Sequence, residues 1–121
     1  MDWSYERIAE TGGAGCYALH ASETSLWKIG RTSNLGGRAA ELSAGLPYEL
    51  RLDRFWFCHD DEDSRILEHA LHGILSGYRL VDPRTGQLRE WFQIDYKTRL
   101  WLFDMTREEI YKRAYRLRLL D

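Results

Sequence analysis

The chain has 121 residues, enough for one domain with a buried core and too few for a second domain of similar size. Apolar residues make up 44%, with five Trp and seven Tyr, and this composition excludes a disordered protein. The formal net charge of −2 excludes a strongly basic nucleic-acid binder, although residues 71–121 carry 10 basic and 7 acidic side chains and so permit a positive face.

No apolar stretch is long enough to span a membrane, and the first residues lack the layout of a signal peptide, so we expect a cytoplasmic protein. The two cysteines, Cys16 and Cys58, each lie in an apolar run. We therefore expect buried free thiols and no disulfide.

Two apolar runs in the first third of the chain predict a pair of short strands, Ala14 to Leu19 and Leu26 to Ile29. The polar link at 20–25 is short enough for a hairpin loop. Such a hairpin brings Tyr17 and Lys28 into one region of the sheet surface, with Lys28 directly across the hairpin.

A helix is predicted over residues 34–44, because Asn34 is a good N-cap and Gly45 and Pro47 end the pattern. The apolar stripe of this helix puts Arg38 on its inward face. Spacing alone leaves two explanations open: Arg38 runs along the core with its guanidinium in solvent, or it binds an anion.

The run from Leu50 to Cys58 predicts a third strand. Alternation assigns four of its side chains to the core and three to solvent; the core set is Leu50, Leu52, Phe55 and Phe57, and the solvent set is Arg51, Asp53 and Arg54. With the helices, the three strands predict an α+β fold built on a small three-stranded antiparallel central sheet.

A second helix is predicted over residues 61–77, with acidic residues at its start that complement the helix dipole. Glu68 and His72 lie one turn apart at the edge of its buried arc, so Glu68 can face a cleft beside the sheet. Three roles for His72 stay open: orienting water, accepting a proton, or a structural hydrogen bond.

A zinc site is an alternative for the histidines, because His69 and His72 form a His-X-X-His pair and Cys58 and His59 precede them. Their spacing matches no common zinc module.

In the last third of the chain, residues 79–81, a turn at 82–86 and an apolar-rich run over 88–94 predict a ribbon or an extended segment. Two helices are predicted after it, 96–104 and one from Thr106 to about Leu119. Thr106 and Glu109 form a capping box for the last helix. We expect Trp91 in the core, with stacking on a base as the alternative.

The basic residues of the last helix suggest a nucleic-acid patch, but favourable i,i+4 pairs argue for a structural explanation. The expected ion pairs are Glu108–Lys112 and Glu109–Arg113, which leave mainly Arg116 and Arg118 unpaired.

Five elements in this order resemble the GIY-YIG nuclease superfamily, in particular its small stand-alone phage- and fungal-type branch. They are Gly15-Cys16-Tyr17, Lys28-Ile29-Gly30 followed by Arg31, Arg38 on the next helix, Glu68-His69-Ala70-Leu71-His72, and Glu90-Trp91-Phe92. The resemblance covers about residues 13–94 of a single domain, 1–121, and makes 95–121 a C-terminal helical extension. Cys16 and Lys28 depart from the family pattern, which has isoleucine and, in many relatives, tyrosine at these positions.

The resemblance implies a metal-dependent endonuclease that hydrolyses phosphodiester bonds in nucleic acid, with double-stranded DNA as the expected substrate. It implies that Glu68 is the protein ligand of a Mg²⁺ or Mn²⁺ ion, an ion that keeps several waters and takes phosphate oxygens. Arg38 and Arg31 would hold the substrate phosphate, and Tyr17 would take the proton from water.

A tyrosine is a poor base at its usual pKa near 10, so Tyr17 needs a nearby cation or a metal-bound water to act at pH 7. Lys28 is the candidate for that cation, and His72 is a further catalytic candidate.

Two other classes of function stay open. A catalytically inactive module of this fold would bind nucleic acid or a protein partner, and the acidic first half of the chain favours it. A structural or regulatory protein would use exposed aromatic residues as an interface. The presence of Tyr17, Arg38 and Glu68 argues against both.

Overall fold

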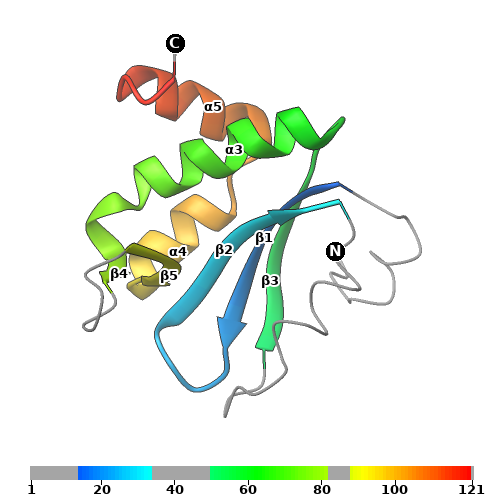
Figure 1. Ribbon diagram of the computed structural model, residues 1–121. Coiled ribbons are helices and arrows are strands. Elements are labelled where there is room, and N and C mark those ends of the chain that lie inside the picture. Colours follow the sequence, from blue (N-terminus) through cyan, green and yellow to red (C-terminus); the bar gives the residue numbers. More distant parts are fainter. Residues whose placement is uncertain (1–13, 34–49, 82–87, 121) are drawn as a thin grey trace.

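The structure is a computed structural model that describes residues 14–33, 50–81 and 88–120. In these residues the chain forms an α+β fold, with three α-helices on one face of a five-stranded antiparallel sheet (Figure 1). The predicted fold class is confirmed, whereas the predicted three-stranded sheet is wrong by two strands. The predicted helix that carries Arg38 lies outside the described residues.

The sheet is organised around β1 (Gly15–Ala21), which pairs antiparallel with β2 (Leu26–Thr32) on one side and with β3 (Leu50–Phe57) on the other. The link between β1 and β2 is a tight turn, in which Thr24 Oγ1 donates a hydrogen bond to the Ala21 carbonyl at 2.7 Å. These are the three strands that the sequence predicts.

Two further strands complete the order β3-β1-β2-β5-β4. β5 (Leu88–Gln93) pairs with β2, and β4 (Arg79–Val81) pairs with β5 at the edge. β5 meets β2 over the short stretch Leu26–Lys28. The sequence predicts an extended segment over 88–94 but does not assign it to the sheet, because so short a contact leaves no separate signal in the pattern.

Both faces of the sheet are buried, which explains why its central strands are nearly continuous apolar runs. Cys16, Ala18 and Ile29 face the helices and belong to the larger core. Tyr17 and Leu19 face the opposite side and belong to a smaller core with residues of β3. The strands therefore contribute side chains to two separate cores, one on each face of the sheet.

The pattern of β3 differs from the prediction at its end. Phe57 is 45% exposed, whereas Trp56 is buried and its Nε1 donates to the Met105 carbonyl at 2.9 Å. A register shift between Ala18 and Leu19 of β1 changes the pairing of the two strands. Alternation along β3 does not predict which side chains are buried at this end, because Trp56 packs in the larger core while Phe57 lies at the exposed end of the strand.

Helix α3 (Asp61–Ile74) packs its apolar side along β1 and β2. The side chain of Asp60 caps the helix by accepting from the backbone N–H of Asp63 at 2.8 Å. The helix ends three residues earlier than predicted, and a 3₁₀ turn (Ser76–Tyr78) leads into β4.

Two helices follow the sheet, α4 (Tyr96–Phe103) and α5 (Arg107–Arg116). The predicted capping box of Thr106 and Glu109 is confirmed at the start of α5. Among the described residues, none of the helices has both the length and the apolar character needed to cross a membrane.

Helix α5 ends in a tight turn that is three residues short of the predicted end. Arg118 has a φ of 60° and donates its N–H to the Tyr115 carbonyl, while the N–H of Leu119 reaches the Ala114 carbonyl at 2.9 Å. This turn sends Leu119 back against α3, where a Cβ added to Gly73 would lie 2.9 Å from Leu119 Cδ1.

Candidate functional site

The β1–β2 hairpin fixes the position of Tyr17. Tyr17 pairs with Gly30, and Lys28 pairs with Leu19, so Lys28 is a diagonal neighbour of Tyr17 on the same sheet face and not directly across from it. A Cβ added to Gly30 would overlap the phenol oxygen and lie 2.7 Å from Tyr17 Cζ. The phenol of the fully buried Tyr17 therefore lies directly on β2.

Lys28 is held by contacts from β5. Its Nζ lies 3.5 Å from Glu90 Oε2 and 5.6 Å from the centre of the Trp91 ring. Trp91 packs against the smaller core, as predicted, and Glu90 keeps 43% of its side chain exposed. The charge of Lys28 is therefore shared with a carboxylate and an indole.

Glu68 lies on α3 next to the end of β2. Arg31 Nε is 3.8 Å from Glu68 Oε1, and Arg31 Nη1 donates to Asp61 at 2.7 Å. The side chain of Glu68 is 19% exposed. Burial and the charge of Glu90 raise the pKa of Glu68 above its ordinary value. The site thus holds a carboxylate whose charge its surroundings disfavour.

His72 connects α3 to β2. Its Nε2 donates to the Ile29 carbonyl at 2.8 Å, just past the last residue of β2 that pairs with β5. The ring also packs against Phe92, with ring centres 5.2 Å apart. Burial lowers the pKa of His72 below its ordinary value. The lowered pKa favours the neutral imidazole, and the bond from His72 to β2 holds α3 on the sheet.

A cleft of about 490 Å³ lies beside α3. Its lining residues come from α3, the start of β4 and the C-terminal turn; they are Arg65, Glu68, His69, His72, Gly73, Ser76, Arg79 and Leu119. The cleft brings together two predicted site residues, Glu68 and His72. Tyr17, Lys28 and Arg31 are not among the described residues that line it.

Arg79 is a cleft residue that the sequence analysis missed. Its guanidinium lies 5.5 Å from the centre of the Phe92 ring, and its positive charge contributes to the lowered pKa of His72. The buried Nε of Arg79 has no hydrogen-bond partner among the described residues. The three-residue strand β4 gives too short a pattern to predict which way Arg79 points.

The described residues contain no group of three or more His, Cys, Asp or Glu side chains that could hold a metal ion. Cys58 and His59 lie at the end of β3, and His69 and His72 lie on α3, so the zinc alternative gains no support in this part of the chain. A single half-buried carboxylate in an open cleft fits a hard cation that takes its other ligands from water and phosphate.

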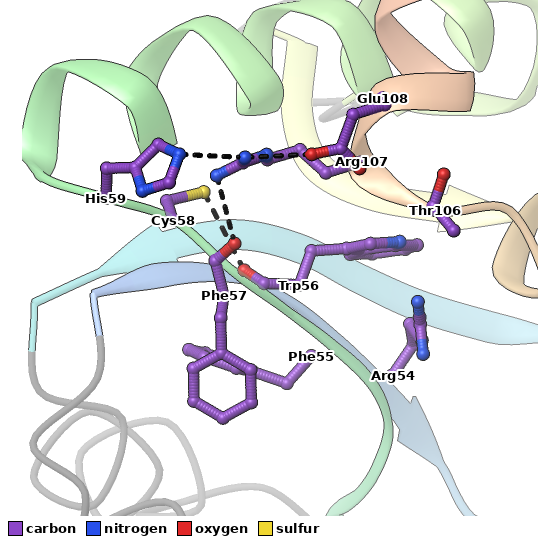
Figure 2. Close-up of a pocket in the computed structure, with 9 residues that line it drawn as sticks. All are labelled: Arg54, Phe55, Trp56, Phe57, Cys58, His59, Thr106, Arg107 and Glu108. Carbon is purple, nitrogen blue, oxygen red and sulfur yellow. Dashed lines mark hydrogen bonds and ion pairs between the residues drawn. The ribbon is translucent and has the colours of Figure 1, made fainter.

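A second pocket of about 360 Å³ lies between the end of β3 and the start of α5 (Figure 2). Arg107 reaches across it and donates to Asp63 at 2.6 Å, Glu108 at 2.9 Å and the Phe57 carbonyl at 3.4 Å. Its Nη2 also lies 3.0 Å from His59 Nε2. Two carboxylates therefore already neutralise the cation of this pocket.

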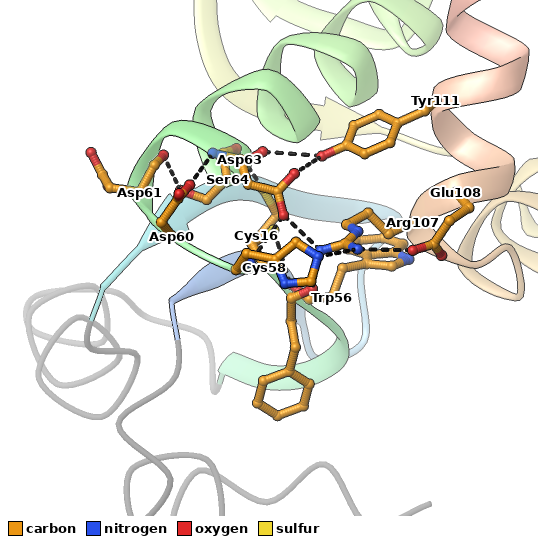
Figure 3. A network of polar contacts seen from close by, with 12 residues as sticks. Cys16, Trp56, Cys58, Asp60, Asp61, Asp63, Ser64, Arg107, Glu108 and Tyr111 are labelled. Carbon is orange, nitrogen blue, oxygen red and sulfur yellow. Dashed lines mark hydrogen bonds and ion pairs between the residues drawn. The ribbon is translucent and has the colours of Figure 1, made fainter.

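The network around Arg107 ties α3 to α5 (Figure 3). Tyr111 Oη donates to Asp63 Oδ1 at 2.5 Å, and the Cys16 thiol donates to the Ser64 carbonyl at 3.1 Å. Burial and the bond to Asp63 raise the pKa of Tyr111. Cys16 is a buried free thiol as expected, whereas Cys58, also free, is half-buried. These contacts hold the start of α3 against α5 and β1.

The comparisons with known proteins gave one family. A protein-family model described as the T5orf172 domain matches residues 14–112. The match extends beyond residue 94 through α4 and into α5. No curated protein and no solved structure matches the chain.

Proposed function

The chain belongs to the T5orf172 domain family, an endonuclease-associated family of GIY-YIG-like or HNH type, and from this premise we propose that it is a metal-dependent endonuclease of the GIY-YIG type acting on DNA. The observation that carries the proposal is the cleft in which a half-buried carboxylate, Glu68, lies with Arg79 and His72. A carboxylate and a guanidinium in one cleft are the groups that a phosphodiester substrate and its counterion require.

Glu68 is the proposed ligand of Mg²⁺ or Mn²⁺. Burial and Glu90 disfavour its charge, and a bound cation relieves both effects. When bound, the ion would stabilise the negative charge that develops on the phosphate and on the departing oxygen. His72 is a positioning residue in this proposal, because its bond to the Ile29 carbonyl holds the helix that carries Glu68.

Arg79 and Arg31 are the described candidates for holding the phosphate. Arg79 lines the cleft, and its planar fork of donors suits a phosphate group. Arg31 lies beside Glu68 and is shared between Glu68 and Asp61, so a phosphate would have to compete with two carboxylates for it. Arg38 lies outside the described residues, so its proposed role in binding the substrate phosphate rests only on the family resemblance.

Tyr17 is the proposed general base, with Lys28 as the cation that lowers its pKa. The phenol lies on Gly30, and Lys28 follows on the same face of β2. Tyr17 is buried, so this role requires that the reacting water reach the phenol from the substrate side.

The second candidate function is a binding module of the same family that does no chemistry. The burial of Tyr17 and the ion pairs of Arg31 favour it, because both leave less of the predicted catalytic set ready to meet a substrate.

Cleavage of supercoiled plasmid DNA by purified protein tests the proposal, with Mg²⁺ or Mn²⁺ and with chelator. We expect nicking that requires the metal, and a loss of at least about 100-fold in rate for Glu68→Gln at limiting metal. Glu23→Gln is the matched control, since it makes the same change at an exposed position of the β1–β2 turn, away from the cleft, and should keep the parent's rate.

If Glu68→Gln cuts as fast as the parent at the same metal concentration, Glu68 is not the ligand. If the parent protein binds DNA but does not cut it in the presence of either Mg²⁺ or Mn²⁺, the chain is a binding module.

A further inference from the structure

The ion pairs predicted along α5 do not form. Glu108 Oε1 accepts from Arg107 at 2.9 Å, and Glu109 Oε1 accepts from the backbone of Thr106 in the capping box. Within residues 14–33, 50–81 and 88–120, Lys112 and Arg113 have no ion pair with a carboxylate. The reason for discounting a positive face on this helix is therefore removed.

The cations of α5 join an exposed aromatic residue of α4. The guanidinium of Arg113 lies 4.3 Å from the centre of the Trp101 ring, and Trp101 is 37% exposed. Arginine stacked on an aromatic ring keeps its outer donors free for an anion. The contact makes the two helices share one continuous surface.

The spacing of the charges puts them side by side on the solvent face. Ile110 and Ala114 are the buried residues of α5, and Lys112 and Arg116 lie one turn apart on the opposite side. Like charges at i,i+4 destabilise a helix slightly, although the dipole at the helix C-terminus favours cations there. An anion across both side chains removes the repulsion.

The row of cations leads to the cleft. Arg118 occupies the left-handed position at the end of α5, where glycine would be favoured, and Leu119, the next residue, lines the cleft that holds Glu68. A polyanion lying along α5 would therefore reach the wall of the cleft.

We propose that this basic surface, defined as Trp101, Lys112, Arg113, Arg116 and Arg118, binds the phosphate backbone of the DNA on which the cleft acts. The proposal rests on the proposed function for the identity of the ligand. Each cation neutralises a phosphate without reading a base, and Trp101 holds Arg113 in place. The surface gives a nearly neutral protein a local field for a polyanion.

Fluorescence anisotropy with a labelled 20-base-pair duplex, in EDTA so that cleavage is excluded, tests the surface. The variant Lys112→Gln/Arg116→Gln should bind about tenfold more weakly at moderate salt, and the slope of log K against log salt should shrink by about 1.8, since each phosphate contact contributes about 0.9. The control Lys112→Arg/Arg116→Lys keeps both charges and should keep affinity and slope.

The outcomes separate the surface from the catalytic proposal. If the charge-removing variant binds DNA as tightly as the parent, with an unchanged salt slope, the proposed DNA-binding surface is wrong. The proposal is also wrong if the parent does not bind DNA and instead binds an acidic protein. If the variant loses binding while neither it nor the parent cleaves plasmid with metal, the surface stands and the catalytic proposal fails. Thermal melting of each variant, expected at the parent's temperature or slightly above, shows that a loss of binding does not come from unfolding.

Discussion

At the scale of single residues, the contact between Tyr17 and Gly30 fixes the position of the proposed base. Gly30 is needed because its missing Cβ leaves space for the phenol of Tyr17. In an ordinary strand, replacing glycine by alanine stabilises the fold. Here the added methyl group overlaps the ring of Tyr17, so the same substitution should destabilise the fold.

We expect Gly30→Ala to lower the free energy of unfolding by about 1–3 kcal/mol, because the ring must move in a packed core. Urea denaturation measures the change. Gly77→Ala is the matched control, since an added Cβ there meets nothing within 4 Å, and it should be neutral or slightly stabilising. Equal stability of Gly30→Ala and the parent would show that Tyr17 does not lie on Gly30.

Glu68 gives a prediction about stability that is independent of catalysis. Burial first, and Glu90 second, raise the pKa of Glu68 in the folded protein. A carboxyl whose pKa is higher in the folded than in the unfolded state makes the folded state less stable once it ionises. Glu68→Gln should therefore be more stable than the parent at pH 7, by about 0.5–2 kcal/mol.

The advantage of Glu68→Gln should shrink as the pH falls from neutral through the raised pKa and vanish below the ordinary value of 4.5, where Glu68 is protonated in both states. Thermal melts across this pH range measure the effect. Added Mg²⁺ should raise the melting temperature of the parent and not that of the variant. A variant less stable than the parent at pH 7 would contradict the prediction.

At the scale of elements, Asp53 joins three of them. Arg99 of α4 donates two hydrogen bonds to the Asp53 carboxylate, each at 2.7 Å, and Trp27 Nε1 of β2 donates a third at 2.9 Å. Burial opposes the charge of Asp53, but these bonds outweigh burial and lower its pKa. The residue that alternation assigned to solvent is thus a link between the sheet and α4.

We expect Asp53→Asn to lower the free energy of unfolding by about 1.5–3 kcal/mol at pH 7, the range for hydrogen bonds to a charged group. The lowered pKa means that Asp53 contributes stability above its ordinary value of 3.8, and that the contribution is lost as the pH falls through the lower folded value. Denaturation at pH 7 and pH 3 should therefore show a difference between the two proteins that shrinks at low pH. Asp104→Asn, at an exposed position after α4, should match the parent.

The helices also show where sequence patterns predict well. The N-caps and the capping box of α5 are local signals, set by residues three apart, and Thr106 and Glu109 were predicted correctly. The ion pairs Glu108–Lys112 and Glu109–Arg113 were wrong, because each glutamate has a nearer partner at the start of the helix. The i,i+4 spacing shows which ion pairs are possible on a helix but not which partner each carboxylate binds.

At the scale of the whole molecule, the α+β class and the three strands β1, β2 and β3 could be predicted, because long apolar runs and a short hairpin fix them. β4 and β5 could not be placed in the sheet, since β5 pairs with β2 over a short stretch that is distant in sequence, and β4 pairs with β5. Arg79 was missed for the same reason. The position of Glu68 was predictable from helical spacing, whereas its pairing with Arg31 depends on how α3 crosses the sheet.

The turn after α5 has a practical consequence for anyone who handles this protein. Leu119 lies against Gly73 and forms part of the cleft wall, so the last described residues are next to the candidate site. An affinity tag or a fused reporter attached after this turn would be tethered close to Leu119 and therefore close to the cleft. A tag there would compete sterically with substrate for the cleft.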